Sequence, residues 1–226
     1  IAFVGDNSIM NLNGGNINDS NGSLVFAQNS SVVNYNLGNR TTGVNPYISL
    51  TDSIINFSAP VKITVTGNGT GVFSSGLLSA VNGNLSLDIA DNANGLYLQD
   101  TNLYVNSGTI NVNGQNSKGI SAENTDVTNA SEINVNGTEA AGIYSGLTRS
   151  GALSNINNNG KINVNGDNGK GIYAAGVDSS STVLGNITVV NNGEINLGTS
   201  PSGMQSKVGI YGDRAVTISN NSDIFG

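Results

Sequence analysis

The chain has 226 residues and a formal net charge of −7, with 10% charged residues, 5% aromatic residues and neither cysteine nor histidine. The missing cysteine excludes a disulfide framework, and the missing histidine removes the commonest general base and metal ligand. The few charges, with no run of Lys or Arg, argue against a nucleic-acid partner. No apolar run reaches the roughly 18 residues that a membrane helix needs, so we expect no direct membrane insertion.

Asparagine and glycine dominate the composition, with 39 and 31 residues respectively. Both residue types tolerate the left-handed conformations that tight turns require. Disordered chains usually carry many charges and prolines, whereas this chain has only 3 prolines. The composition is therefore typical of a folded chain built from short strands and frequent turns.

The first hundred residues contain seven short segments that we predict to be strands. These are residues 9–12, 24–26, 32–37, 54–57, 61–66, 77–81 and 85–89. The stretch 39–49, with Pro46 and Tyr47, is predicted to be a loop. We expect one domain over residues 1–226, in which residues 1–80 form less regular coils with insertions and residues 81–226 form regular coils.

A sequence repeat organises the second half of the chain. The motif Ile-Asn-Val-Asn-Gly begins at Ile110, Ile133 and Ile162, and it returns in degenerate form at Ile195. Alternation of apolar residues with Asn is typical of a strand with one buried and one wet face. A Gly-Ile-Tyr motif or a close variant follows each block, at residues 119–121, 142–144, 171–173 and 209–211. A repeat with a period of about 20 to 50 residues indicates stacked units.

A third strand candidate in each unit ends in an asparagine, always four residues before the first Ile of the next motif. These asparagines are Asn106, Asn129, Asn158, Asn191 and Asn220. The fixed offset predicts a ladder in which each amide bonds the local backbone and the amide one coil above. Three short strands per unit, each paired in parallel with its counterpart one coil away, predict an all-β parallel β-helix of about eight coils.

Variable loops supply candidate binding residues, because insertions into repeats often carry specificity. The connection before the last Gly-Ile-Tyr motif grows to residues 199–208, and the stretches after two earlier copies also lengthen. The candidates in these loops are Thr148, Arg149, Ser179, Met204 and Lys207. Length drift that a solenoid surface tolerates is the alternative explanation.

Four tyrosines each follow the apolar anchor of their unit by one residue, at Tyr97, Tyr144, Tyr173 and Tyr211. An inward-facing anchor would turn all four rings outward, onto one face of the helix. An exposed column of this kind suits recognition of sugars or protein, and Tyr144, Tyr173 and Tyr211 are therefore binding candidates. Cross-strand stacking that protects the sheet is the alternative.

Two segments carry a resemblance to a known family. Residues 159–174 read Asn-Gly-Lys-Ile-Asn-Val-Asn-Gly-Asp-Asn-Gly-Lys-Gly-Ile-Tyr-Ala, and residues 192–198 read Asn-Gly-Glu-Ile-Asn-Leu-Gly. They resemble passenger repeats of bacterial type V autotransporters, above all the large fusobacterial outer-membrane adhesins. The resemblance covers about residues 80–226, and the remainder is similar by composition only.

The resemblance implies a right-handed parallel β-helix displayed on the surface of a Gram-negative bacterium. It also implies adhesion to host cells or to other bacteria, through host receptors or glycans. The family's signal peptide and membrane-spanning C-terminal barrel do not occur in this sequence, so we expect an extracellular segment of a longer passenger. The lack of cysteine suits a chain that crosses the periplasm unfolded.

Two alternatives to a non-catalytic adhesin segment stay open. One is a spacer that holds a distal binding head away from the cell. The other is a polysaccharide-degrading β-helix enzyme, which needs clustered carboxylates or a basic residue beside calcium ligands. Asp88, Asp91 and Asp100 are the densest acidic group but have no basic partner nearby in sequence, and Ala93 fills a required position of the calcium-like segment 91–95. We therefore predict no enzymatic activity, no cofactor and no metal site.

Overall fold

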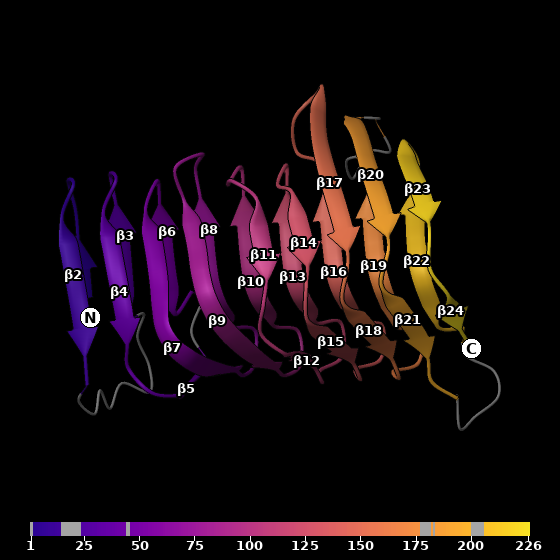
Figure 1. Ribbon diagram of the computed structural model, residues 1–226, viewed down its shortest axis with the longest axis horizontal. Helices are drawn as coiled ribbons and strands as arrows, with labels where there is room; N and C mark the ends of the chain where they lie inside the picture. Colours follow the sequence, from indigo (N-terminus) through magenta and orange to yellow (C-terminus); the bar gives the residue numbers. More distant parts are fainter. Residues whose placement is uncertain (1, 15–23, 44–45, 177–181, 183, 200–205) are drawn as a thin grey trace.

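The computed structural model describes residues 2–14, 24–43, 46–176, 182, 184–199 and 206–226. All regular structure in these ranges is β-strand. Each strand pairs in parallel with its counterparts in the neighbouring coils, and Figure 1 shows the resulting rows of aligned arrows along a rod. The predicted parallel β-helix is therefore confirmed.

Three sheets run along the rod. Sheet A contains, in order, β1 (Ala2–Val4), β3 (Val25–Gln28), β6 (Ile48–Thr51), β8 (Thr70–Ser75), β10 (Asn94–Gln99), β13 (Lys118–Glu123), β16 (Ala141–Gly146), β19 (Lys170–Ala175) and β22 (Val208–Asp213). Sheet B contains β2 (Ile9–Asn13), β4 (Val32–Asn36), β7 (Ile54–Val65), β9 (Ala80–Ile89), β12 (Ile110–Val112), β15 (Glu132–Val135), β18 (Lys161–Val164), β21 (Glu194–Leu197) and β24 (Ile224–Phe225), with β5 (Arg40–Thr42) paired to β7. Sheet C contains β11 (Tyr104–Asn106), β14 (Val127–Asn129), β17 (Ala152–Asn158), β20 (Gly185–Asn191) and β23 (Val216–Asn220).

The coils differ between the two halves of the rod. Sheet A has nine strands, one per coil, so the described residues form nine coils where about eight were predicted. The last five coils have three strands each, as predicted, because sheet C begins only at β11. In earlier coils the paired strand candidates 54–57 and 61–66 merge into β7, and 77–81 and 85–89 merge into β9.

A register shift allows β7 and β9 to turn the corner as continuous strands. Phe57 pairs with Gly83, and the next pair is Val61 with Leu85, so more residues lie on β7 than on β9 between these pairs. Pro60 lies inside this irregularity, where the lack of an N–H costs no ladder bond. The proline therefore marks a bend in a strand and not its end.

The prediction of a loop over residues 39–49 is wrong at both ends of the stretch. Arg40–Thr42 form β5, which pairs with residues 63–65 of β7, and β6 begins at Ile48. The segment Arg-Thr-Thr lacks the apolar alternation that identified the other strands, because only Thr42 of its three residues is buried. Tyr47, taken as a loop residue, packs in the core.

The core is one apolar column inside the coils. The Ile and Val of the three intact motifs point inward and are fully buried. The Ile residues of the Gly-Ile-Tyr segments are also fully buried, except Ile210, which is partly buried. Ile133, for example, lies in register with Ile110 of the coil below and Ile162 of the coil above. Burying such a side chain contributes about 1.5–3 kcal/mol, so each copy of the motif adds to the stability of the rod.

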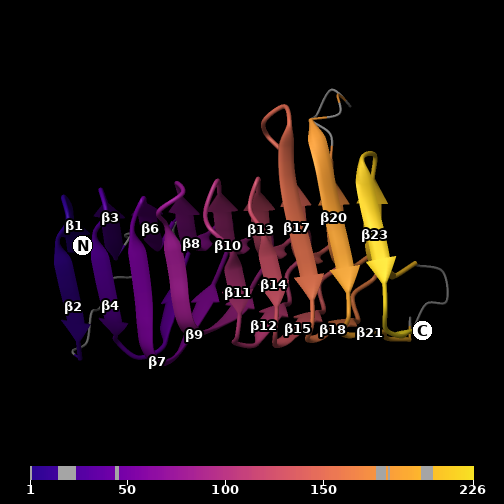
Figure 2. The same cartoon turned by 45° about the horizontal axis from the view of Figure 1, so that its top comes forward.

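The two ends of the chain lie at opposite ends of the rod (Figure 1). Strands β17 and β20 extend beyond the other strands of sheet C, which Figure 2 shows most clearly. Their additional residues pair with each other, beginning with Ala152 beside Gly185. This projection carries Leu153, an aliphatic side chain that is 70% exposed.

Candidate functional site

The five asparagines of the predicted ladder occupy the last positions of the strands in sheet C and stand in register. The first four amide nitrogens each donate to the amide oxygen of the next coil, at distances of 2.9, 2.8, 2.7 and 2.7 Å from Asn106 through to Asn220. The Asn220 amide donates instead to Ser222 O at 2.7 Å. All except Asn220 are fully buried. A buried amide requires such partners, so the ladder fastens the coils together and lies outside the binding surface.

Sequence analysis missed further asparagine ladders on the outside of the coils. In sheet B, Asn111, Asn134, Asn163 and Asn196 are linked by bonds of 2.7–3.0 Å, with Asp88 as the first acceptor. The other ladders are Asn11–Asn34–Asn56–Asn82, Asn113–Asn136–Asn165 and Asn159–Asn192–Asn221. The signal was present, because two of these ladders use the Asn positions of the Ile-Asn-Val-Asn-Gly motif.

An outward-facing row of aromatic side chains runs along sheet A, and we call it the aromatic column. Its members are Phe3, Phe26, Phe73, Tyr97, Tyr144, Tyr173 and Tyr211, with Ser49 and Ser121 at the two remaining register positions. Sequence analysis found the four tyrosines and missed the three phenylalanines. Each phenylalanine also follows an Ala or Val, so the same offset would have found them.

The rings of the aromatic column touch wherever two members are adjacent in the last coils. The ring centroids of Tyr144 and Tyr173 are 5.3 Å apart at 83°, and those of Tyr173 and Tyr211 are 5.2 Å apart at 77°. Such edge-to-face contacts are favourable by about 0.5–1.5 kcal/mol. Lys118 Nζ lies 4.0 Å from the centroid of the Tyr144 ring, in a cation–π contact. Burial lowers the pKa of this lysine, against the nearby charge of Glu123, which raises it.

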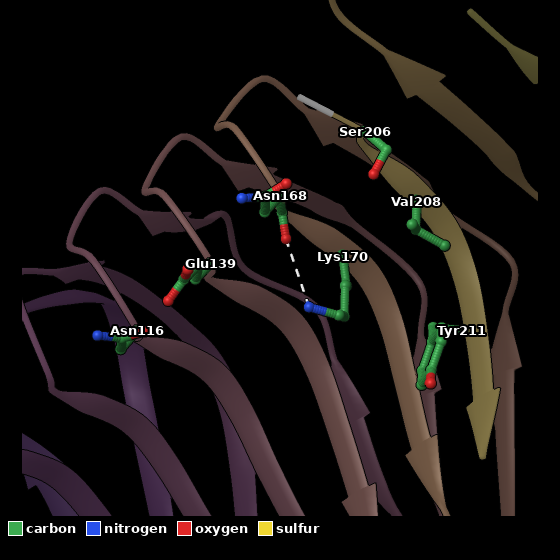
Figure 3. A pocket seen from close by; sticks show the side chains of 7 residues that line it. All are labelled: Asn116, Glu139, Asn168, Lys170, Ser206, Val208 and Tyr211. Carbon is green, nitrogen blue, oxygen red and sulfur yellow. Dashed lines mark hydrogen bonds between the residues drawn. The ribbon is translucent and has the colours of Figure 1, made fainter. Parts of the chain in front are cut away.

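A groove of about 490 Å³ lies at one edge of sheet A, beside the aromatic column (Figure 3). Its lining residues are Asn116, Glu139, Asn168, Lys170, Ser206, Val208 and Tyr211. Asn116, Glu139 and Asn168 come from the turns that precede β13, β16 and β19, and Lys170 is the first residue of β19. Ser206 precedes β22, whereas Val208 and Tyr211 lie within it. The groove therefore brings together residues from four consecutive coils.

Left-handed turns build one wall of the groove. Asn116, Glu139 and Asn168 have φ values of 54°, 57° and 54°, a conformation that Asn adopts readily and Glu rarely. The N–H of Asn116 donates to Thr138 O at 3.0 Å, and that of Glu139 donates to Asp167 O at 2.8 Å. The turns are therefore stacked by backbone bonds, and their side chains are left pointing away from the coils.

The loop candidates do not meet in one place. The Thr148 Oγ1 accepts a bond of 2.7 Å from Asn124, and Arg149 pairs with Asp100 at 2.7 Å. The side chain of Lys207 is only 4% exposed and lies 3.8 Å from the Asp167 carboxylate. Thr148 and Arg149 follow strand β16, whereas Lys207 precedes β22, so the length of a sheet A strand, roughly 20 Å, separates them. Ser179 and Met204 lie outside the described residues.

The acidic residues singled out in the sequence also stay apart. Asp88 pairs with Lys62, Asp91 accepts a bond of 2.8 Å from the Gln115 N–H, and Asp100 pairs with Arg149. Within the described ranges, no three His, Cys, Asp or Glu side chains are grouped so as to hold a metal ion. The same part of the chain contains no helix that is long and apolar enough to span a bilayer.

Alkaline titration tests how tightly the aromatic column packs. Burial, then the hydrogen bond to Glu123 and its charge, raise the pKa of Tyr97 to about 12 from an ordinary value of 10.0. A raised folded pKa means that the neutral phenol stabilises the fold fully below pH 10, and that this contribution is lost as the pH rises through about 12. We expect the free energy of unfolding to fall across this window, and to fall less in Tyr97→Phe. Urea unfolding at each pH measures the free energy of unfolding, and absorbance of tyrosinate follows the ionisation. If the free energy of unfolding depended on pH identically in the parent and in Tyr97→Phe, the raised pKa of Tyr97 would be contradicted.

Comparison with known proteins adds no relative. No protein-family model, no curated protein and no solved structure matches this chain.

Proposed function

We propose that this chain is a non-catalytic adhesin segment that attaches to a host cell or to another bacterium through sheet A. The aromatic column carries the proposal. Seven of the chain's twelve tyrosine and phenylalanine residues stand in this single outward row. Large aromatic side chains are enriched at binding interfaces. Their concentration in one outward row, which only Ser49 and Ser121 interrupt, supports an interaction surface on this sheet.

The scaffold supports this use of the surface. Parallel pairing and the asparagine ladders hold the backbone of each ring at a fixed place. The row is therefore preorganised, and ordering it on binding costs little free energy. The fold and the repeats agree with an autotransporter passenger displayed on a bacterial surface, and we propose that location for the segment. The partner is then a receptor protein or a glycan on the opposing cell.

A spacer is the second candidate, and one observation favours it. The edge-to-face contacts at 5.2 and 5.3 Å by themselves give a reason for tyrosine to recur in this row. An enzyme receives no such support, because Asp88, Asp91 and Asp100 each have structural partners and do not converge on a common point.

Attachment to cells distinguishes the two candidates. The immobilised chain is compared with the double variant Tyr144→Ser, Tyr173→Ser, whose substitutions copy the native Ser49 and Ser121 of the same row. We expect attachment to fall by about tenfold or more, the effect of losing interface anchors. Leu153→Ser is the matched control, because it removes an exposed apolar side chain from sheet C. Equal attachment by the Tyr variant and the control would favour the spacer.

A further inference from the structure

We infer that the groove beside β22 is a binding site for a neutral saccharide, with Tyr211 as the surface on which a sugar ring stacks. This inference rests on the proposed adhesive function and specifies a ligand class for one part of sheet A. It depends on three properties of the groove: the free backbone N–H of its last described turn, the unpaired polar side chains of its wall, and the balance of its charges.

The groove lies beside the last turn of this row that the structure describes, the turn at Asn168. The Asn92, Asn116 and Glu139 N–H groups each donate to a carbonyl in the turn of the next coil, at 2.9, 3.0 and 2.8 Å. The next turn would be the connection between β21 and β22, which is longer in sequence than its counterparts. Among the described residues, the Asn168 N–H has no acceptor. This N–H group therefore adds a donor to the wall of the groove.

The polar side chains of the wall are not committed to the protein. In the part of the chain that the structure describes, the Asn116 amide, the Glu139 carboxylate and the Asn168 amide form no side-chain hydrogen bond or ion pair. The ladder asparagines, in contrast, are bonded from coil to coil. Amides donate and accept, and carboxylates accept, which matches hydroxyl groups that do both. A ligand rich in hydroxyls can use these groups without breaking any protein contact.

The charges of the groove balance. Glu139 contributes one negative charge and Lys170 one positive charge, and the adjacent Asp167 is paired with Lys207. An anionic ligand would meet the Glu139 carboxylate and a chain whose net charge is −7. A cationic ligand would meet the Lys170 ammonium. A neutral ligand is therefore favoured over either charged class.

One aromatic ring completes the site. Tyr211 is 42% exposed, and its edge-to-face contact with Tyr173 fixes its position. Figure 3 shows its ring and Val208 on the side of the groove opposite the turns. The apolar face of a sugar ring packs on such a phenol while its hydroxyls reach the amides. The groove volume of about 490 Å³ also falls in the range of about 300–1,000 Å³ typical of small-molecule sites.

Lactose, maltotriose and cellobiose are suitable probes, with 3′-sialyllactose as the anionic counterpart of lactose and triglycine as a peptide. Saturation-transfer NMR measures binding, and amide shifts of the 15N-labelled chain locate it.

We expect at least one neutral saccharide to bind and to shift the amide signals of Glu139, Asn168 and Tyr211. The same saccharide should bind at least tenfold more weakly to Tyr211→Ser. Glu139→Gln is expected to raise the affinity for 3′-sialyllactose relative to lactose. Leu153→Ser, which removes an exposed apolar side chain of sheet C outside the groove and the aromatic column, should bind as the parent does.

Three results would overturn the inference: no neutral saccharide shifting the groove residues, tighter binding of 3′-sialyllactose or triglycine than of the neutral sugars, or unchanged binding by a folded Tyr211→Ser. The proposed function fails separately. If saccharides do not bind but attachment to cells still depends on Tyr144 and Tyr173, adhesion stands and this ligand class is wrong. If saccharides bind the groove but the chain attaches to no cell, the site stands and the adhesive role is wrong.

Discussion

Asn158→Ala is expected to lower the free energy of unfolding by about 3 kcal/mol, because it leaves two buried polar groups unpaired at once. The Asn158 amide nitrogen donates to Asn191 at 2.7 Å, and its oxygen accepts from Asn129 at 2.8 Å. All three residues are fully buried, so water cannot replace either bond. Each orphaned group costs about 1–3 kcal/mol. Urea unfolding followed by circular dichroism, with the slope fitted for each variant, measures the change.

Asn157→Thr is the matched control for this substitution. Asn157 is the neighbouring residue of the same strand, its side chain is partly exposed, and its partners in register are Thr128 and Val190. Its side chain makes no hydrogen bond with any described residue, and Thr suits a strand, so we expect a change within about 0.5 kcal/mol. Similar losses of unfolding free energy in the two variants would mean that the buried ladder stabilises the fold no more than the solvent-facing side of the sheet does.

The regular coils were predictable because their signal is local. Ile and Val alternate with Asn within five residues, and the closing Gly and the preceding Asn recur at fixed offsets, so one unit identifies its own strands. The merged strands β7 and β9 were not predictable in this way. Their corner depends on the pairing of Phe57 with Gly83 and of Val61 with Leu85, partners that lie 26 and 24 residues apart in the chain. Without knowledge of these partners, Pro60 indicates the end of one strand and the start of another.

The same distinction between local and long-range signals applies to the candidate binding surface. The tyrosine positions follow from one offset in the repeat, and the direction of the rings follows from the burial of the residue before them. The groove depends on turns that are distant in sequence and stacked in space, including a Glu139 in a left-handed conformation that nothing in Thr-Glu-Ala suggests. The ion pair between Arg149 and Asp100 likewise joins residues two coils apart, and it removes Arg149 from the free cations on which the loop hypothesis depended.

Gly137→Ala is expected to destabilise the fold by about 3 kcal/mol or more, for a reason that also explains the glycine at the end of the three intact motifs. A Cβ on Gly137 would lie 1.9 Å from Gly114 O, and one on Gly166 would lie 2.1 Å from Gly137 O. The obstacle in each case is the backbone of the coil below, which no rotamer change can move. Overpacking usually costs about 1–3 kcal/mol, and a backbone obstacle places this site at the upper end.

The neighbouring bonds prevent the coils from separating to relieve that contact. The Gly137 N–H donates to Val112 O at 2.9 Å, and the Asn136 amide donates to Asn113 at 2.8 Å, so the spacing of the coils is held on both sides of the new methyl group. Gly38→Ala is the control, since its Cβ would meet nothing within 4 Å and its φ lies outside the left-handed region, and we expect a gain of about 0.5 kcal/mol from reduced freedom of the unfolded chain. Urea unfolding gives both values, and hydrogen exchange should show the loss concentrated in β12 and β15. Equal stability of the two variants would show that the coils move apart freely, which the short distances between them do not allow.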